Sequence, residues 1–107
     1  MTKIEIYKKN DEIFSIIIKG HTGYNEYGKD IVCASLSTMV ITTINGIEKI
    51  CDDTIKYEKK EGYLKIEILK QNEISNKLIE NLIDLIINLS KDYPKNIKLI
   101  NKEVNPC

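Results

Sequence analysis

The sequence predicts an α+β fold: a two-layer sandwich in which a mixed β-sheet carries two helices on one face, in the order ββαββαβ. Two long segments with apolar residues three or four apart predict the helices. Short apolar runs predict five strands, and turn signals at Asn10-Asp11 and Glu61-Gly62 join four of them into hairpins. With 107 residues, the chain has room for one core, so we expect a single domain over residues 1–107.

The first hairpin lies near the N-terminus. Ile4 and Ile6 alternate with polar neighbours, as in a strand with one buried face. After the turn, residues 13–18 are almost continuously apolar, which is typical of a central strand covered on both faces.

A long uncharged segment predicts the first helix, from Ile31 to about Ile50. Asp30 stands directly before it, and aspartate is a preferred N-cap. The expected core stripe follows the helical spacing: Val32, Leu36, Met39, Val40, Thr43, Ile47 and Ile50. The segment could also cross a membrane, but five of its first 17 residues are Ser or Thr and Asn45-Gly46 interrupts it. We therefore expect a buried helix and no membrane partner.

The second half of the chain repeats this order of elements. Residues 54–59 and 63–69 form the second hairpin, and residues 97–100 form a last short strand. Asn72 or a neighbour caps a second helix over about residues 73–91, which ends before Tyr93-Pro94 because proline cannot continue it. The residues expected to face the core are Leu78, Leu82, Leu85, Ile86 and Leu89.

Composition limits the possible partners. All 16 basic residues are lysines, and 16 acidic residues balance them, so neither nucleic acid nor an anionic membrane is attracted by net charge. Three widely spaced cysteines suit neither a disulfide framework nor a metal site. No secretory signal is evident, so we expect a cytoplasmic protein without metal or cofactor.

The segment between His21 and Cys33 carries the candidate chemistry. His21, the only histidine, follows the central strand, and Cys33 occupies the third position of the N-capped helix, where backbone amides favour a thiolate. The end of the strand and the start of the helix belong to one edge of the sheet, so the two residues should meet there. Ser37 is one turn further on the same face, and the amide of Cys33 with its neighbours could stabilise an oxyanion.

Plainer interpretations exist for each of these residues. A buried cysteine is usually a small apolar residue, and Asp30 is most simply a cap that could also orient His21. Gly20, Gly23 and Gly28 are turn residues or hinges of a mobile loop. Tyr24 and Tyr27 could line a peptide pocket or only pack the loop, and Lys59-Lys60 is a solvated hairpin tip.

Residues 23–29 also approach a phosphate-binding P-loop, with Gly23, Gly28 and Lys29 at the required spacing. Asp30, however, stands where Ser or Thr should hold magnesium, and its carboxylate would compete with phosphate for the amides. The chain is also too short for the rest of a nucleotide-hydrolysing domain.

One extended motif resembles a known family, the ribosomal-processing cysteine protease Prp family of bacteria. The motif reads Gly20-His21-x-Gly23-Tyr24-x-x-x-Gly28-x-Asp30-Ile31-Val32-Cys33-Ala34-x-x-Ser37. The family commonly has alanine where this chain has Thr22, whose hydroxyl could alter loop motion or bond to His21.

The resemblance implies a cysteine endopeptidase domain spanning the chain, active as a cytoplasmic homodimer. Its substrate would be the precursor of a large-subunit ribosomal protein, cut after an aromatic pair in the N-terminal extension through a thioester intermediate. Cys33 would be the nucleophile and His21 its base, with Asp30 and Ser37 in support. The loop over residues 20–29 would be mobile and would become ordered when substrate binds.

Three classes of protein therefore remain open on the sequence. They are the protease, a ribosome-associated binding module in which Cys33 is incidental, and a homodimeric regulator with a redox-sensitive thiol. Selective, substrate-protected alkylation of Cys33 would distinguish the first from the other two.

Overall fold

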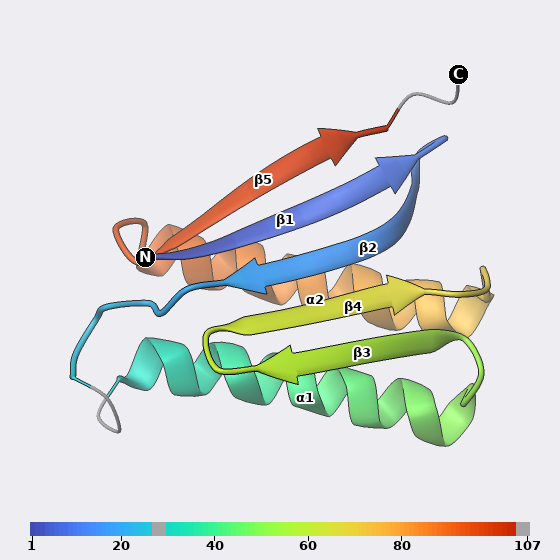
Figure 1. The fold of residues 1–107 in the computed structure, drawn as a ribbon, viewed down its shortest axis with the longest axis horizontal. Coiled ribbons are helices and arrows are strands. Elements are labelled where there is room, and N and C mark those ends of the chain that lie inside the picture. Colours follow the sequence, from blue (N-terminus) through green and yellow to red (C-terminus); the bar gives the residue numbers. More distant parts are fainter. Residues whose placement is uncertain (27–29, 105–107) are drawn as a thin grey trace.

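The computed structural model describes residues 1–26 and 30–104. Five strands and two helices follow in the predicted order ββαββαβ. They are β1 (Thr2–Lys9), β2 (Glu12–Lys19), α1 (Ile31–Ile50), β3 (Ile55–Lys60), β4 (Tyr63–Ile68), α2 (Glu73–Asp92) and β5 (Ile97–Glu103) (Figure 1). The α+β fold is confirmed, and each expected strand and helix is present, with β5 extending three residues beyond its predicted end.

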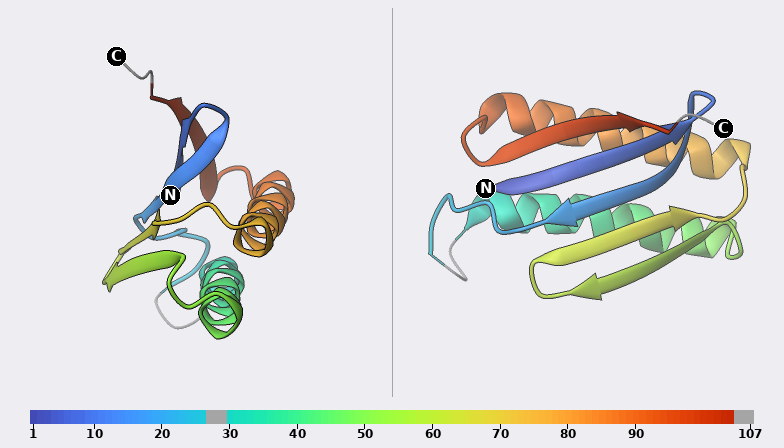
Figure 2. Two further views of the ribbon diagram at one scale, coloured as in Figure 1. Left: turned by 90° about the vertical axis from the view of Figure 1, so that its right-hand side faces the viewer. Right: turned by 45° about the horizontal axis from the view of Figure 1, so that its top comes forward.

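The strands form one mixed sheet in the order β3-β4-β2-β1-β5. Only β1 and β5 run parallel, and the remaining neighbours are antiparallel. Both helices cover the same face of this sheet (Figure 2). The central position of β2 is confirmed, but the expectation that both its faces are covered is wrong, because Ile17 stays partly exposed on the face without helices.

Ion pairs, rather than a second layer, protect that open face. The Glu5 side chain is only 10% exposed and lies 3.0 Å from the Lys19 ammonium and 2.8 Å from that of Lys102. The hydrogen bonds from Lys102 and Lys19 lower the pKa of Glu5, although burial opposes them. A nearly buried carboxylate is tolerated here because two lysines on neighbouring strands compensate its charge.

Helix α1 has the predicted bounds and buries one stripe of residues: Val32, Leu36, Val40, Ile44 and Ile47. Ile44 is buried although it was not among the expected core residues. Ile50, which was expected in the core, lies in the last turn of the helix and is 59% exposed. Length and composition alone would let this helix span a membrane. Its apolar stripe instead packs into the core cluster formed with the sheet and α2.

Helix α2 is capped by Asn72, whose side chain accepts hydrogen bonds from the amides of Ile74 and Ser75. Its buried residues are Ser75, Ile79, Leu82 and Ile86. Leu78 and Leu89 only flank this stripe, and Leu85 is 38% exposed, so its predicted core position is wrong. The buried stripe is rotated by about one residue from the expected one, because Ile79 rather than Leu78 faces the sheet.

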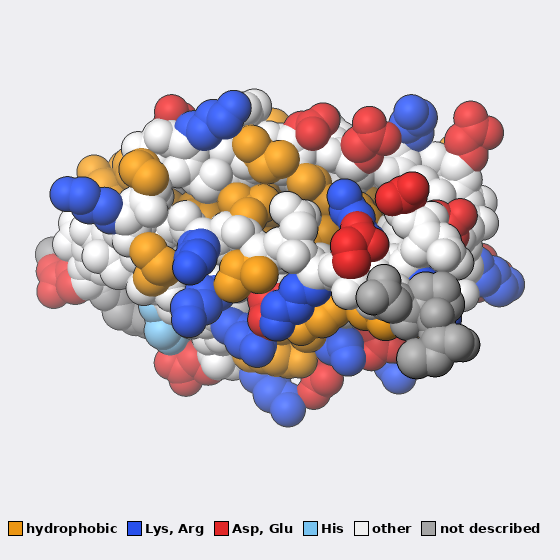
Figure 3. Space-filling model, turned by 90° about the horizontal axis from the view of Figure 1, so that it is seen from above, with side chains coloured by type: hydrophobic (Ala, Val, Ile, Leu, Met, Phe, Trp, Pro, Cys, Tyr) orange, Lys and Arg blue, Asp and Glu red, His pale blue; other side chains and the backbone are white. Residues whose placement is uncertain are grey.

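The surface carries both signs of charge. On the face seen from above the view of Figure 1, lysine and acidic side chains are interspersed, and hydrophobic side chains gather between them (Figure 3). This face therefore has no continuous positive patch of the kind that holds a nucleic-acid backbone.

Candidate active site

The start of α1 places Cys33 at the third helical position, as predicted. Asp30 is the N-cap, and its Oδ1 accepts the Cys33 amide at 2.9 Å. The expectation that this amide could help to hold an oxyanion is wrong for this state, because the cap already occupies it. The amides of Ile31 and Val32 have no hydrogen-bond partner in the part of the chain that the structure describes.

Asp30 also organises the loop before the helix. Its Oδ2 accepts hydrogen bonds from the Thr22 hydroxyl at 2.5 Å, the Tyr24 amide at 3.0 Å and the Asn25 amide at 3.5 Å. Loop amides that could bind a phosphate are therefore directed at a carboxylate, which argues against the P-loop interpretation. Asp30 makes no hydrogen bond to His21, so it can orient the imidazole only through the loop.

Thr22 is the second anchor of this loop. Thr22 is 1% exposed. Its hydroxyl donates a hydrogen bond to Asp30, and its carbonyl accepts one from the Asn96 side-chain amide at 2.9 Å. The Thr22 hydroxyl thus bonds to the helix cap rather than to His21. It ties the residue after His21 to the start of α1 and to the segment before β5.

These contacts determine the ionisation of Asp30. Burial alone would raise the pKa of this carboxyl, but the hydrogen bonds from Thr22, Cys33, Tyr24 and Asn25 together lower it. A carboxyl with a lowered folded-state pKa contributes stability above its unfolded-state pKa, and this contribution is lost as the pH falls through the folded-state value.

We expect Asp30→Ala to lower the free energy of unfolding by about 2 kcal/mol at pH 7, the upper range for loss of an N-cap, because several donors lose their acceptor. The difference from wild type should begin to shrink as the pH falls below about 4, the ordinary pKa of an aspartate in the unfolded chain, and should be lost as the pH falls through the lower pKa of the folded state. Urea unfolding of both proteins at pH 7 and at pH 3 measures the loss of stability and its decrease at low pH. Asp53→Ala is the control, since Asp53 forms an exposed ion pair with Lys70. An equal loss in both variants would contradict the role of Asp30.

His21 and Cys33 meet at one end of the sheet, as the topology argument predicted. Together with Ser37 and Glu61, they line two adjoining clefts. His21 is exposed and Cys33 is half-buried. No hydrogen bond joins the imidazole to the thiol within residues 1–26 and 30–104. Such bonds are often long without substrate and tighten when it binds.

The two clefts differ in chemistry. One continues along α1 under the β3–β4 hairpin, and its apolar lining includes Leu36, Val40, Ile41, Tyr63 and Leu64. The other lies on the loop side, where Gly23, Asn25, Asp30 and Ala34 complete its lining. A peptide bond over Cys33 would therefore have the aliphatic and aromatic side chains of α1 and β4 on one side, and residues of the loop and of the first helical turn on the other.

The tip of the β3–β4 hairpin is the part of the site that sequence reasoning missed. Lys59 and Lys60 are exposed, as expected of a solvated tip, but residues 59–63 also line the apolar cleft beside His21 and Cys33. Antiparallel pairing of β2 with β4 sets Lys19 opposite Tyr63, which brings the turn beside the residue after β2. No local motif marks this neighbour, so only the order of the strands could have identified it.

The remaining loop residues divide into three groups. Gly20 and Gly23 line one cleft each and have positive φ angles of +88° and +69°. Tyr24 is 47% exposed and stacks edge-on against Tyr93, with ring centroids 5.3 Å apart, which packs the loop onto the end of α2. Tyr27 and Gly28 lie outside the described residues. Substrate binding and loop motion stay predictions.

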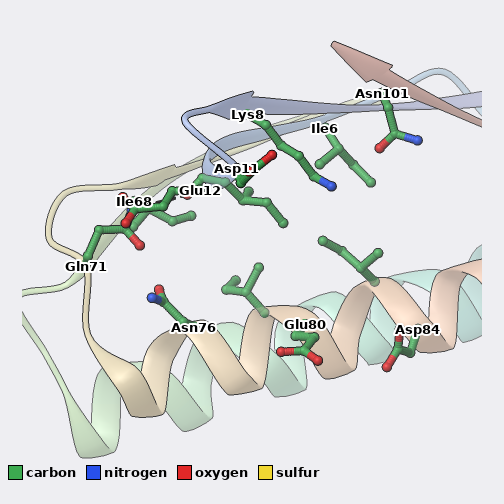
Figure 4. A pocket seen from close by; sticks show the side chains of 13 residues that line it. Ile6, Lys8, Asp11, Glu12, Ile68, Gln71, Asn76, Glu80, Asp84 and Asn101 are labelled. Carbon is green, nitrogen blue, oxygen red and sulfur yellow. Dashed lines mark hydrogen bonds between the residues drawn. The ribbon is translucent and has the colours of Figure 1, made fainter. Parts of the chain in front are cut away.

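A further cleft lies at the opposite end of the sheet, near the β1–β2 turn and the start of α2 (Figure 4). Its lining includes Asp11 in the turn, Glu12 at the start of β2, and Glu80 and Asp84 on α2. None of its described lining residues is cysteine, histidine or serine, so it offers neither a thiol nor a pair of hydroxyl and imidazole. Within the described ranges, no group of three or more His, Cys, Asp or Glu side chains could hold a metal ion.

Comparison with known proteins identifies the family. The family model described as cysteine protease Prp matches residues 1–98. The ribosomal processing cysteine protease Prp of Staphylococcus aureus is 30% identical over 95 residues, covering 84% of this chain and 90% of that protein. The Bacillus subtilis protein of the same name is 23% identical over 107 residues, with 92% and 96% covered.

Solved structures show the same fold. The crystal structure of the essential S. aureus Prp with a covalently linked product peptide superposes with a TM-score of 0.91, at 23% identity over 95% of this chain and 100% of that chain. SMU.848 from Streptococcus mutans superposes with a TM-score of 0.79, at 28% identity over 99% and 96% of the two chains. Given the family match over residues 1–98 and the shared fold, this chain belongs to the ribosomal processing cysteine protease Prp family.

Proposed function

We propose that this cysteine protease removes the N-terminal extension of a large-subunit ribosomal protein precursor, cutting after an aromatic pair. The observation that carries the proposal is that Cys33, at the capped start of α1, and His21 line the same clefts. The S. aureus relative has been crystallised with a substrate peptide and with a covalently linked product peptide, which supports peptide hydrolysis through a covalent intermediate.

The reaction begins with transfer of the Cys33 proton to His21. The thiolate attacks the carbonyl carbon of the scissile bond, and the tetrahedral intermediate collapses as the carbon–nitrogen bond breaks. The imidazolium of His21 gives its proton to the leaving amine, which leaves a thioester on Cys33. Water, losing a proton to His21, then attacks this thioester and releases the carboxylic acid and the thiol.

Charge on the intermediate needs donors other than the Cys33 amide, which serves the cap. The amides of Ile31 and Val32 belong to the same first turn and lie at the positive end of the helix dipole. They are the candidates for the oxyanion site, and one such donor is typically worth about 3 kcal/mol of transition-state energy.

The aliphatic part of the apolar cleft supports the proposed preference for aromatic residues, although Lys59, Lys60 and Glu61 also line this cleft. Leu36, Val40 and Leu64 present aliphatic side chains there, and Tyr63 adds an aromatic ring. Such a lining favours a large apolar side chain over a charged one. The homodimer and the cytoplasmic location expected from the resemblance also stay predictions.

Mass spectrometry of a candidate precursor after incubation with the protein tests the proposal. We expect one cut, directly after the aromatic pair, because the apolar cleft selects the residues beside the scissile bond. A precursor with this pair replaced by Ala-Ala is the control and should lose most of its cleavage. An uncut precursor, or equal cleavage of both substrates, would overturn the proposed substrate or the proposed specificity, respectively.

A further inference from the structure

The ring of His21 lies against Gly62, in the turn between β3 and β4. A Cβ atom added at Gly62 would stand 3.2 Å from His21 Nε2, 3.6 Å from Cε1 and 3.8 Å from Cδ2. The first distance is shorter than ordinary van der Waals contact between carbon and nitrogen. Any residue other than glycine would therefore push the imidazole away by a few tenths of an ångström.

The backbone that carries His21 cannot easily follow such a push. The Gly20 amide donates to the Gly62 carbonyl at 2.8 Å, which continues the β2–β4 pairing up to the residue before His21. On the other side, a Cβ atom at Gly20 would stand only 2.7 Å from the Met1 carbonyl oxygen. The chain before the imidazole is thus held between the hairpin tip and the N-terminus.

The residue after His21 is held as well. Thr22 is almost fully buried, its hydroxyl bonds to Asp30, and its carbonyl accepts a hydrogen bond from Asn96. With both neighbours anchored, the imidazole can move chiefly by rotation of its own side chain. The contact with Gly62 is one limit on that rotation.

We propose that Gly62 is a positioning residue for His21: its missing side chain leaves the space in which the imidazole is kept beside Cys33. The inference rests on the proposed role of His21 as the base for Cys33. A base must reach hydrogen-bond distance from the proton that it takes, and a displacement of about 1 Å can cost about 100-fold in rate. Gly62 contacts the His21 ring and would affect the reaction only through the position of that ring.

Two substitutions separate this contact from simple backbone strain. Gly62 has a φ of +64°, which alanine adopts with strain but asparagine tolerates better. Both residues add the Cβ atom that meets the ring. A displacement of a few tenths of an ångström is a fraction of the roughly 1 Å that can cost about 100-fold. We therefore expect Gly62→Ala and Gly62→Asn each to lower kcat by about 4- to 10-fold with KM nearly unchanged, while the asparagine variant keeps the higher melting temperature.

Asp11→Ala is the matched control. Asp11 has a φ of +63°, in the β1–β2 turn at the opposite end of the sheet. Alanine there introduces comparable backbone strain, but kcat should stay at the wild-type value. If activity instead follows melting temperature across the three variants, or if Gly62→Ala keeps full kcat, the positioning role is overturned.

A measurement without substrate tests the geometry directly. Because His21 is the only histidine, its two ring C–H signals can be identified by NMR without selective labelling. We expect nuclear Overhauser contacts from these protons to the Gly62 α-protons in the wild type, and ring shifts that move in both Gly62 variants. Absence of the contacts would overturn the inference. Their presence in a protein that cleaves no precursor would overturn the proposed function and leave the packing of His21 on Gly62 intact.

Discussion

Cys33→Ala should reduce cleavage of the precursor to background, a loss of about 10⁴-fold or more, because no other described thiol shares the cleft with His21. Cys33 is half-buried at the first turn of α1. Its backbone amide would still bond to Asp30, so the helix start should survive the change. We expect the free energy of unfolding to change by less than about 1 kcal/mol. Mass spectrometry of the products and thermal unfolding measure the two effects.

Cys51→Ser is the matched control for this experiment. Cys51 follows α1, and its thiol donates to the Asn72 side-chain oxygen at 3.4 Å, far along the chain from the loop that carries His21. A serine hydroxyl can make the same contact, so processing should continue at the wild-type rate. Near-normal cleavage by Cys33→Ala, or its loss in Cys51→Ser alone, would show that the nucleophile is assigned to the wrong cysteine.

His21→Ala should lower kcat/KM by about 100- to 10,000-fold, the usual range for loss of a general base. The thiol would lose its proton acceptor and the leaving amine its proton donor. Because His21 is exposed and makes no hydrogen bond to another described residue, its removal should leave the melting temperature almost unchanged. Initial rates on a peptide that spans the cleavage site, together with thermal unfolding, measure the effect.

Chemical rescue separates a lost base from a damaged fold. Free imidazole in the assay should restore part of the His21→Ala rate, since the deleted ring leaves space beside Gly62. It should not rescue Cys33→Ala, which lacks the nucleophile. A large drop in melting temperature without rescue would instead indicate that His21 is a structural residue.

Patterns that depend on local hydrogen bonds and helical spacing could be predicted from the sequence. Asp30 and Asn72 are the N-caps, and α1 has the predicted bounds. Caps and first turns involve residues three or four apart, so neighbours in the chain are sufficient to define them. The third-position cysteine, and with it the candidate nucleophile, followed from this local rule.

Core positions were predicted less well. Ile44 is buried in place of Ile50, Ile79 is buried in place of Leu78, and Leu85 is partly exposed, although each lies on a segment of the correct type. On each helix, partly buried apolar residues flank the buried stripe, such as Ile41 on α1 and Leu78 on α2, so periodicity leaves the stripe uncertain by about one residue. The sheet and the neighbouring helix decide which of the candidate faces turns inward.

The sequence by itself determined the two helices, the five strands, and the placement of His21 and Cys33 at one edge of the sheet. Only the tertiary structure decided that β4 pairs with β2, which brings Gly62 under the imidazole and the hairpin tip into the cleft. It also decided that Thr22 bonds to Asp30 and that the cap occupies the Cys33 amide. Contacts within a few residues follow from local chemistry, whereas strand pairing across about 40 positions depends on how the whole core packs.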